Sequence, residues 1–270
     1  MANKQLIPKI IHCVWLSGDD KPVLYLNCLK SWQEKMPDYE IKEWSLDKLP
    51  NEVTEHPFVK GAVESRKWAY ATDYIRLWLL YNYGGIYMDL DVMVFKSFDP
   101  FLNHRFFSSI EFEADAFIKS ISKKEVVGAG IDAAIMGSEK QHPFIEEVLN
   151  YYDDLTFINK PEYHFKYIMP RVLTRVAKTK FRFKQIPNYQ ILKDDMHLYP
   201  SEVFSAIFDF NLIGCNSFDE AMPILSVSPI RYSIHLCAHS WYEGTFTRDW
   251  KWHIKHFIYL TYKRLCFKDD

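Results

Sequence analysis

The chain has 270 residues, of which 48% are hydrophobic and 25% are charged, and its formal net charge is −2 at pH 7. This length suits one large α/β domain or two small ones, and the composition is that of a globular protein rather than a disordered one. Because the positive and negative charges nearly balance, the chain as a whole offers no strong attraction for nucleic acid. Aromatic residues make up 17% of the chain, which fits either a thick core or platforms for sugars and bases.

The cysteines and the N-terminus indicate a compartment. There are five cysteines, and none of them forms a Cys-x-x-Cys pair. This pattern is typical of a reduced, cytoplasmic chain rather than of a disulfide scaffold or a zinc site. The N-terminus lacks the apolar segment of a signal peptide, and no apolar run reaches the roughly 18 residues that a membrane-spanning helix needs. We therefore expect a cytoplasmic protein whose contact with a membrane is limited to the surface.

Strand and helix patterns alternate in the first third of the chain. Residues 9–16 form a β-rich run closed by turn-forming residues, 23–37 have helical spacing, and 39–45 alternate like a strand. This β-α-β order predicts a parallel sheet with crossover helices. The clearest helix covers residues 65–85, where apolar residues recur with a helical period and two glycines end the helix.

The remaining elements are predicted by the same reasoning. Residues 128–138 read as a strand, 142–155 and 167–179 as helices, and 233–244 as a last strand that runs into a loop. Residues 248–265 form a helical pattern rich in basic and aromatic side chains. This C-terminal segment, residues 246–270, either packs on a main domain of residues 1–245 or lies at a membrane surface that carries anionic lipids.

Residues 83–95, YGGIYMDLDVMVF, carry the carboxylates of Asp89 and Asp91 in an otherwise apolar run. Burying carboxylates without a partner is costly. In one continuous strand both side chains would point to the same face, about 7 Å apart. Near the carboxyl end of a strand in an open α/β sheet, where ligands bind, two such groups suit Mg²⁺ or Mn²⁺, and such a cation typically bridges nucleotide phosphates. The alternative is a chance Asp-x-Asp on a solvated edge strand.

A second charged pair lies on the preceding helix. Asp73 and Arg76 are three residues apart and therefore share a helix face. That face adjoins Trp68 and Tyr83, and the helix leads directly into the strand with the two aspartates. The alternative for this pair is an ordinary surface ion pair.

The segment WAYATDYIRLWLLYNYGGIYMDLDVMVF closely resembles the signature of glycosyltransferase family 32, in which Ser-Asp-x-x-Arg on a helix precedes Gly-Gly-x-Tyr and Asp-x-Asp. Residues 7–22, 130–149 and 233–241 resemble, in order, the family's opening strand, its Asn/Asp-containing strand with a His-Pro helix, and its closing His-x-x-x-x-Ser-Trp. The sequence departs from the family pattern in two places. Thr72 replaces the usual serine, and His239 stands where the family often has a small residue.

The resemblance implies a GT-A fold, a Rossmann-like α/β fold with a mainly parallel central sheet. It also implies transfer of a hexose from a nucleotide sugar, UDP-galactose or UDP-glucose, with retention of configuration and with Mn²⁺ or Mg²⁺ as cofactor. The implied acceptor is a saccharide, lipid-linked in capsule-type pathways, and the implied process is bacterial surface polysaccharide synthesis. The alternatives are a nucleotide-sugar hydrolase and a carbohydrate-binding pseudoenzyme, although the intact charged set argues against the latter.

The resemblance further assigns metal-binding and catalytic positions. Asp91 is expected as a direct metal ligand and Asp89 as a ligand or a ribose contact. His235, from the closing strand, is expected as a third ligand, with a neutral core histidine as the alternative. Asp132 occupies the position of the family's sugar-contacting Asn or Asp. A covalent nucleophile and a front-face substitution both stay open.

The expected donor-binding residues are Trp15, Asp73, Arg76, Tyr87, Ser240 and Trp241. Trp15 would stack on the base, with an ordinary core tryptophan as the alternative. Asp73 and Arg76 would hold sugar hydroxyls through charge-assisted hydrogen bonds, and Tyr87 would line the same site. Ser240 and Trp241 resemble a closing loop that covers the diphosphate and excludes water.

Overall fold

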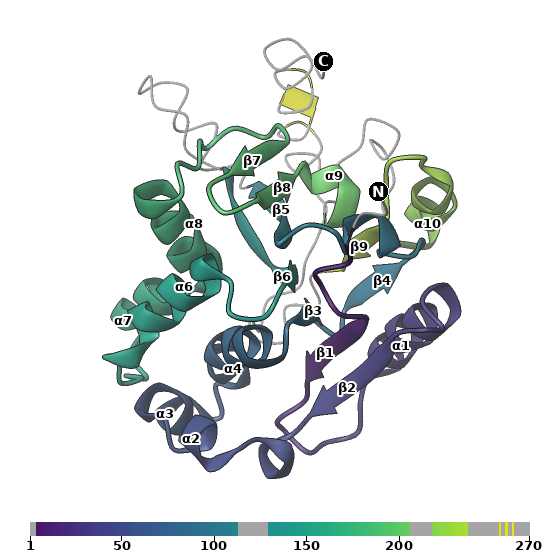
Figure 1. Cartoon of the computed structure of the whole chain (residues 1–270). Coiled ribbons are helices and arrows are strands. Elements are labelled where there is room, and N and C mark those ends of the chain that lie inside the picture. Colours follow the sequence, from purple (N-terminus) through teal and green to yellow (C-terminus); the bar gives the residue numbers. More distant parts are fainter. Residues whose placement is uncertain are drawn as a thin grey trace.

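A computed structural model describes residues 4–112, 129–205 and 218–236, together with residues 254, 257, 258 and 261. A seven-stranded sheet runs through the described part of the molecule, with helices packed against it (Figure 1). Its strand order is β2-β1-β3-β6-β5-β8-β7. The strands, in that order, are Glu40–Trp44, Ile10–Val14, Gly85–Met88, Ala129–Ser138, Phe106–Phe112, Met196–Tyr199 and Gln190–Leu192.

The pairing confirms the predicted α/β class with a mainly parallel sheet. β1 pairs in parallel with β2 and β3, and β5 pairs in parallel with β8. β6 is antiparallel to both β3 and β5, and β7 is antiparallel to β8. Strands β1, β2, β3, β5 and β8 therefore run in one direction, and β6 and β7 run against them.

Two hydrophobic cores lie on the two faces of this sheet. The first is closed by α2 (Asn51–Thr54), α3 (Pro57–Glu64), α4 (Trp68–Tyr83), α6 (Pro143–Asp153), α7 (Pro161–Tyr167) and α8 (Met169–Lys180). The second contains side chains of α1 (Val23–Lys35), α9 (Ser201–Phe204) and β4 (Val92–Val94). β4 pairs with β9 (Ser233–His235) in a separate two-stranded sheet, and α10 (Phe218–Val227) lies near it (Figure 1). Short 3₁₀ turns span Leu46–Lys48 and Asp99–Phe101.

Two glycines connect α4 to β3 because the backbone needs conformations that other residues avoid. Gly84 and Gly85 have φ values of 66° and 103°, in the region where a Cβ is strained. A Cβ on Gly85 would also lie 2.6 Å from the carbonyl oxygen of Ile10 in β1. The Gly-Gly pair therefore lets the chain leave the helix and enter the sheet directly beside β1.

The prediction of one continuous strand over residues 83–95 is wrong. β3 ends at Met88, and the N–H of Val92 donates to the carbonyl of Asp89 at 3.1 Å, which closes a turn. β4 then leaves the large sheet and pairs antiparallel with β9. The indole of Trp32 in α1 donates to the carbonyl of Val92 at 2.7 Å. Alternation cannot reveal this break, because both short strands are buried and apolar.

The predicted helix 248–265 lies outside the described residues, apart from residues 254, 257, 258 and 261. The same holds for the boundary expected at residue 245. The predicted strand 233–244 is described only up to Leu236, of which residues 233–235 form β9. None of the helices in the described part has both the length and the hydropathy needed to cross a bilayer.

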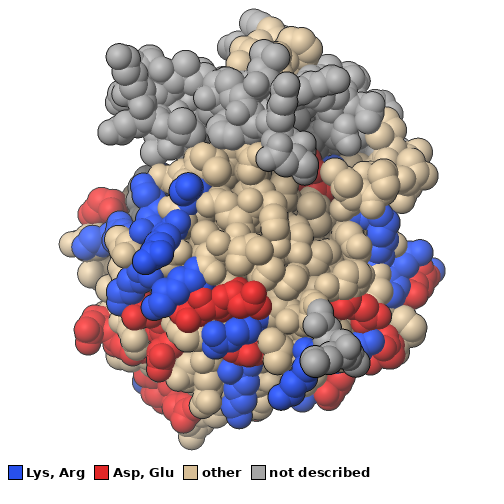
Figure 2. Space-filling model, turned by 45° about the horizontal axis from the view of Figure 1, so that its top comes forward, with Lys and Arg blue, Asp and Glu red and all other residues tan. Residues whose placement is uncertain are grey.

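Charged side chains of both signs share the face of the molecule drawn in Figure 2. Lys and Arg lie next to Asp and Glu around a broad area without charge. This mixture agrees with the small net charge of the sequence.

Candidate functional site

Asp89, Asp91 and His235 converge beyond the carboxyl end of β3. One ligand atom from each of the three residues lies within 4.8 Å of the others. The two aspartates belong to the turn between β3 and β4, and His235 is the last residue of β9, where it pairs with Val92. Nε2 of His235 is 3.3 Å from Oδ1 of Asp91. The structure therefore brings together the three residues that were expected to bind a metal, although two of them do not lie in a strand.

Main-chain hydrogen bonds hold this turn from both sides. The N–H of Asp89 donates to the carbonyl of Ala134 in β6 at 2.9 Å, and the N–H of Leu236 donates to the carbonyl of Asp91 at 2.9 Å. Sequence reasoning missed Ala134, because a main-chain carbonyl leaves no signal in residue type. The turn is thus fixed to β6 and β9 before any ligand arrives.

Tyr87 and Arg76 support the carboxylate of Asp89. The Tyr87 hydroxyl donates to Oδ1 of Asp89 at 2.6 Å, and Nη1 of Arg76 lies 3.4 Å from the same oxygen. The guanidinium of Arg76 also lies over the Tyr87 ring, 4.5 Å from its centroid. Burial raises the pKa of Asp89, while the positive charge of Arg76 opposes the shift. Both contacts use Oδ1, so the other carboxylate oxygen stays available as a ligand atom.

Asp73 and Arg76 form a buried ion pair, so the surface alternative is wrong. Their side chains approach to 3.1 Å, and only 8% and 5% of the two residues is exposed. Burial raises the pKa of Asp73 to about 7, against the lowering effect of Arg76. Arg76 further donates to the carbonyl of Ala133 at 2.7 Å. The guanidinium thus ties α4, β6 and Asp89 together, and its contact with a sugar stays a prediction.

Asp132 lies at an irregularity of β6, next to these groups. The β5–β6 register shifts between Ser108 and Ile110, and Oδ1 of Asp132 accepts the N–H of Ala134 at 2.8 Å. Its Oδ2 is buried and has no hydrogen-bond partner among the described residues. Buried polar atoms are nearly always paired. An unpaired carboxylate oxygen beside Ala133 and Ala134, which contact Arg76 and Asp89, is therefore a candidate to receive a ligand hydroxyl.

Trp15 follows β1 at the same edge of the sheet and is half-buried. Its Nε1 donates to the carbonyl of Asp19 at 2.7 Å, and its ring meets the ring of Tyr25 edge-on, with centroids 5.6 Å apart. It is therefore not a fully buried core tryptophan, and its stacking on a base stays a prediction. Ser240 and Trp241, expected in the closing loop, lie outside the described residues.

Two side chains of α1 support the site and were not predicted to do so. The hydroxyl of Ser31 accepts the N–H of Val94 at 3.0 Å, and Trp32 donates to the carbonyl of Val92 as described above. Among the described residues β9 is the one strand that pairs with β4, and these two contacts bind the main chain of β4 to α1. The spacing of residues 31 and 32 marks them only as part of a buried helix face.

The donor set suits a hard divalent cation. Two carboxylates and an imidazole offer oxygen and nitrogen ligands of the kind that Mn²⁺ and, with fewer nitrogen contacts, Mg²⁺ accept. The guanidinium of Arg76 contacts Oδ1 of Asp89, so Oδ2 of that carboxylate remains available to a cation. The residues present therefore fit the cation that the sequence pattern indicated.

Comparison with known proteins agrees with this chemistry. Residues 22–107 match the family described as the glycosyltransferase sugar-binding region containing a DXD motif. Inositol phosphoceramide mannosyltransferase 3 of Schizosaccharomyces pombe is 30% identical over 164 residues, which are 60% of this chain and 40% of that protein. Mannosyl phosphorylinositol ceramide synthase SUR1 of Saccharomyces cerevisiae is 31% identical over 160 residues, 57% of this chain and 37% of that protein. The matched chain thus spans less than half the length of both relatives.

Among solved structures, the galactosyltransferase LgtC in complex with donor and acceptor sugar analogs is 14% identical, with a TM-score of 0.46 over 92% of this chain and 94% of that one. The names of the two yeast relatives concern inositol-containing ceramide lipids, so the expected bacterial surface polysaccharide pathway finds no support in them. Residues 22–107, which contain Asp73, Arg76, Asp89 and Asp91, therefore match the DXD-containing sugar-binding region of glycosyltransferases, in agreement with the resemblance to glycosyltransferase family 32.

Proposed function

We propose that this chain is a metal-dependent, retaining glycosyltransferase that moves a hexose from a nucleotide sugar to an acceptor hydroxyl. The observation that carries the proposal is the convergence of Asp89, Asp91 and His235 within 4.8 Å at the carboxyl end of β3, inside and beside the matched sugar-binding region. These residues would hold Mn²⁺ or Mg²⁺. When bound, such a cation stabilises the charge that develops on the leaving nucleoside diphosphate.

The chain's own residues prepare this site. Tyr87 and Arg76 fix one oxygen of Asp89 at 2.6 and 3.4 Å, so the carboxylate does not have to reorient when a ligand binds. Preorganisation of this kind lowers the cost of stabilising charge during the reaction. Because Arg76 is itself buried and paired with Asp73, its role in the proposal is to position Asp89 and the β6 main chain.

Asp132 supplies the group that would meet the sugar. Its buried Oδ2 has no protein partner among the described residues, so it can accept a hydrogen bond from a hydroxyl of the donor hexose. A carboxylate there would fix the ring relative to the diphosphate and thereby favour one angle of attack. Retention of configuration follows from the family resemblance, and the anomeric configuration of the product, read by NMR, tests it.

The acceptor proposed here differs from a capsule polymer. The yeast relatives are named for mannosyl transfer to inositol-containing ceramide lipids, and these names favour a hydroxyl of a lipid headgroup or a lipid-linked saccharide. The basic and aromatic residues of segment 248–265 support a position at a cytoplasmic membrane surface. Mannose accordingly joins galactose and glucose as a candidate donor sugar.

The test is a transfer assay with the purified full chain and Mn²⁺. Nucleotide sugars of galactose, glucose and mannose are each incubated with an inositol-headgroup lipid or with a soluble saccharide, and both nucleotide release and labelled product are measured. We expect product with one donor and the lipid acceptor, and none after chelation. Nucleotide release that does not depend on acceptor would indicate a hydrolase. Sugar binding without release would indicate a pseudoenzyme.

A further inference from the structure

A strongly basic surface lies around α8. Residues 160–193 contain nine Lys and Arg and a single acid, Glu162, although the whole chain has a net charge of −2. All nine basic side chains are exposed to solvent, and we refer to them together as the α8 surface: Lys160, Lys166, Arg171, Arg175, Lys178, Lys180, Arg182, Lys184 and Lys193. Charge of one sign at this density creates a local positive potential that the small net charge of the chain conceals.

The position of α8 on the domain separates its apolar side chains from its basic ones. Its buried residues include Val172, Leu173, Val176 and Ala177. On the exposed face, Arg171, Arg175 and Lys178 recur three to four residues apart. Lys and Arg also gather along one side of the face drawn in Figure 2, the side on which Figure 1 draws α8. The helix is thus anchored by its apolar face and presents its basic face to solvent.

The chain that follows α8 adds to this surface. Nζ of Lys178 donates to Oε1 of Gln185 at 2.5 Å, and Nζ of Lys193 lies 5.7 Å from the centroid of the Phe181 ring. Phe181 directly follows the last residue of the helix. Residues from α8, from the segment after it and from the β7–β8 turn therefore bring their positive charges together at the end of the helix.

Few carboxylates neutralise these charges. Lys180 pairs with Glu147, and Nζ of Lys193 is 3.7 Å from a carboxylate oxygen of Asp194. In the described part of the chain, three basic residues at the end of α8 have no carboxylate within ion-pair distance: Lys178, Arg182 and Lys184. Their charges are therefore available to an anionic partner.

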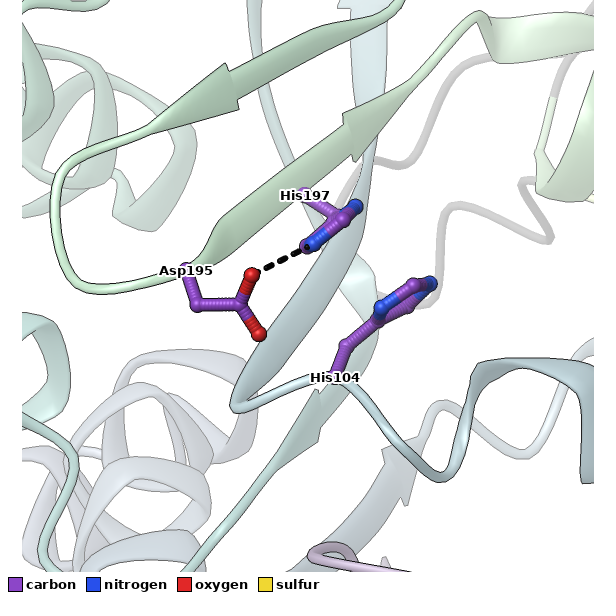
Figure 3. A group of neighbouring side chains, drawn as sticks. All are labelled: His104, Asp195 and His197. Atoms are coloured by element: carbon purple, nitrogen blue, oxygen red, sulfur yellow. Dashed lines mark hydrogen bonds and ion pairs between the residues drawn. The ribbon is translucent and has the colours of Figure 1, made fainter. Parts of the chain in front are cut away.

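The turn between β7 and β8, which carries Lys193, is held by a cluster of side chains. Figure 3 shows its members, His104, Asp195 and His197. Nε2 of His197 is 2.9 Å from Oδ1 of Asp195, and the two imidazole rings stack with their centroids 3.6 Å apart. Oδ2 of Asp195 accepts the main-chain N–H of Arg105 at 3.1 Å. These contacts fix the turn and keep Lys193 in place at the end of α8.

The α8 surface borders the proposed donor site. The main-chain N–H of Met169, the first residue of α8, donates to the carboxylate of Asp73, which the pair with Arg76 links to the site. After the helix, the side chain of Gln185 donates to the carbonyl of Ala129 at 3.1 Å. Ala129 pairs with the last residue of β5, and β5 runs in the same direction as β3. The basic surface therefore follows the carboxyl edge of the sheet, at which the metal-binding residues also lie.

We propose that the α8 surface docks on a bilayer that carries anionic lipids and thereby holds the donor site beside a lipid-borne acceptor. The choice of a lipid partner rests on the proposed function, whose acceptor is a lipid headgroup or a lipid-linked saccharide. Anionic headgroups are complementary to Lys and Arg, and each basic residue near such a surface strengthens binding about fivefold. Salt screens this attraction. The surface is separate in sequence from segment 248–265, so the two contributions can be measured independently.

Vesicle binding tests the proposal without any sugar transfer. The purified full chain is sedimented at low salt with vesicles of phosphatidylcholine and phosphatidylserine, and with vesicles of phosphatidylcholine alone. We expect much stronger binding to the vesicles that contain phosphatidylserine, and weaker binding as the salt concentration rises. The variant Lys178→Gln/Arg182→Gln/Lys184→Gln should bind these vesicles roughly tenfold or more weakly. Its melting temperature should not change, because all three side chains are exposed.

The matched control is Lys30→Gln/Lys35→Gln/Lys60→Gln, which removes three exposed positive charges from α1 and α3. Both triple variants keep segment 248–265, and the control should bind like the unmodified chain. Equal binding by the two triple variants would overturn the proposal. So would binding of the unmodified chain to duplex DNA but not to the vesicles, which would identify a nucleic-acid surface. Because no nucleotide sugar is present, these outcomes do not depend on the proposed function, which transfer to a soluble saccharide tests separately.

Discussion

The hydroxyl of Tyr87 donates a 2.6 Å hydrogen bond to Oδ1 of Asp89. Tyr87 lies in β3, and Asp89 lies just beyond its end, so the last part of the strand orients the first carboxylate of the motif. Arg76 reaches the same oxygen from α4 and covers the Tyr87 ring. The orientation of the Asp89 carboxylate therefore depends on the side chains of Tyr87 and Arg76 as well as on the path of the main chain.

Tyr87→Phe should remove this hydrogen bond and keep the ring on which Arg76 lies. We expect Mn²⁺ affinity to fall about 10- to 100-fold, the usual effect of losing a partner of a metal ligand, with little change in melting temperature. Mn²⁺ titration of nucleotide release measures it. Tyr83→Phe is the matched control, since Tyr83 is 40% exposed at the end of α4. Equal Mn²⁺ dependence in both variants would contradict the positioning role.

Asp91→Asn should abolish most of the transfer activity while the fold stays intact. The amide has lost the charge that attracts a divalent cation, but the main-chain carbonyl of residue 91 can still accept the N–H of Leu236. We expect a loss of about 100-fold or more in kcat/KM, roughly 3 kcal/mol of transition-state stabilisation. Circular dichroism checks the fold, and Asp154→Asn, at an exposed position after α6, is the control. Retained turnover that still requires metal would exclude Asp91 as a ligand.

Trp15→Ala should weaken nucleotide binding by roughly 1–3 kcal/mol if the indole stacks on the base. Trp15→Phe keeps an aromatic face but loses the hydrogen bond to Asp19, so it should retain much of the affinity. Calorimetric titration with a nucleoside diphosphate in the presence of Mn²⁺ measures both. If Trp15→Ala instead lowers the melting temperature and leaves nucleotide affinity unchanged, Trp15 serves packing alone.

Local patterns predicted the elements that are long or clearly bounded. The strand at 9–16 is observed as Ile10–Val14, the helix at 23–37 as Val23–Lys35, and the helix at 65–85 as Trp68–Tyr83. In each case the hydrophobic period and a Pro or Gly near the end carry the information. Strands β5 and β8 were not predicted, because no distinctive turn signal separates their sequences from the neighbouring loops.

The site was predictable only as far as residue types reveal it. The DXD carboxylates and His235 were found, but the turn that brings them together depends on the main-chain atoms of Ala134 and Leu236, which any residue could supply. Asp73 and Arg76 read equally well as a surface pair, because burial is a tertiary property.

The opening strand carries a pH-sensitive contact. The indole of Trp44 donates to Nδ1 of His12 at 3.1 Å, so that nitrogen carries no proton, and Nε2 is 2.9 Å from the carbonyl of Gly84. His12 is fully buried in β1. Burial is the main reason that its pKa falls to about 4, and the hydrogen bond to Gly84 only partly opposes this. The neutral ring thus links β1, β2 and the Gly84–Gly85 connection that leads to Asp89.

Acidification should therefore destabilise the fold through His12. The folded pKa of about 4 lies below the unfolded value of 6.5, so the unfolded state binds the proton first, and stability is full above pH 6.5 and declines as the pH falls toward 4. Between pH 7 and pH 5 this loss is on the order of 2 kcal/mol. Urea unfolding of the unmodified chain and of His12→Gln at the two pH values isolates the contribution of His12 to this loss of unfolding free energy. The other histidines contribute equally in both proteins and cancel in the comparison. The glutamine amide can offer the same donor and acceptor but does not titrate. The variant should consequently lose about 2 kcal/mol less on acidification, and identical losses in the two proteins would show that His12 is not the group that responds.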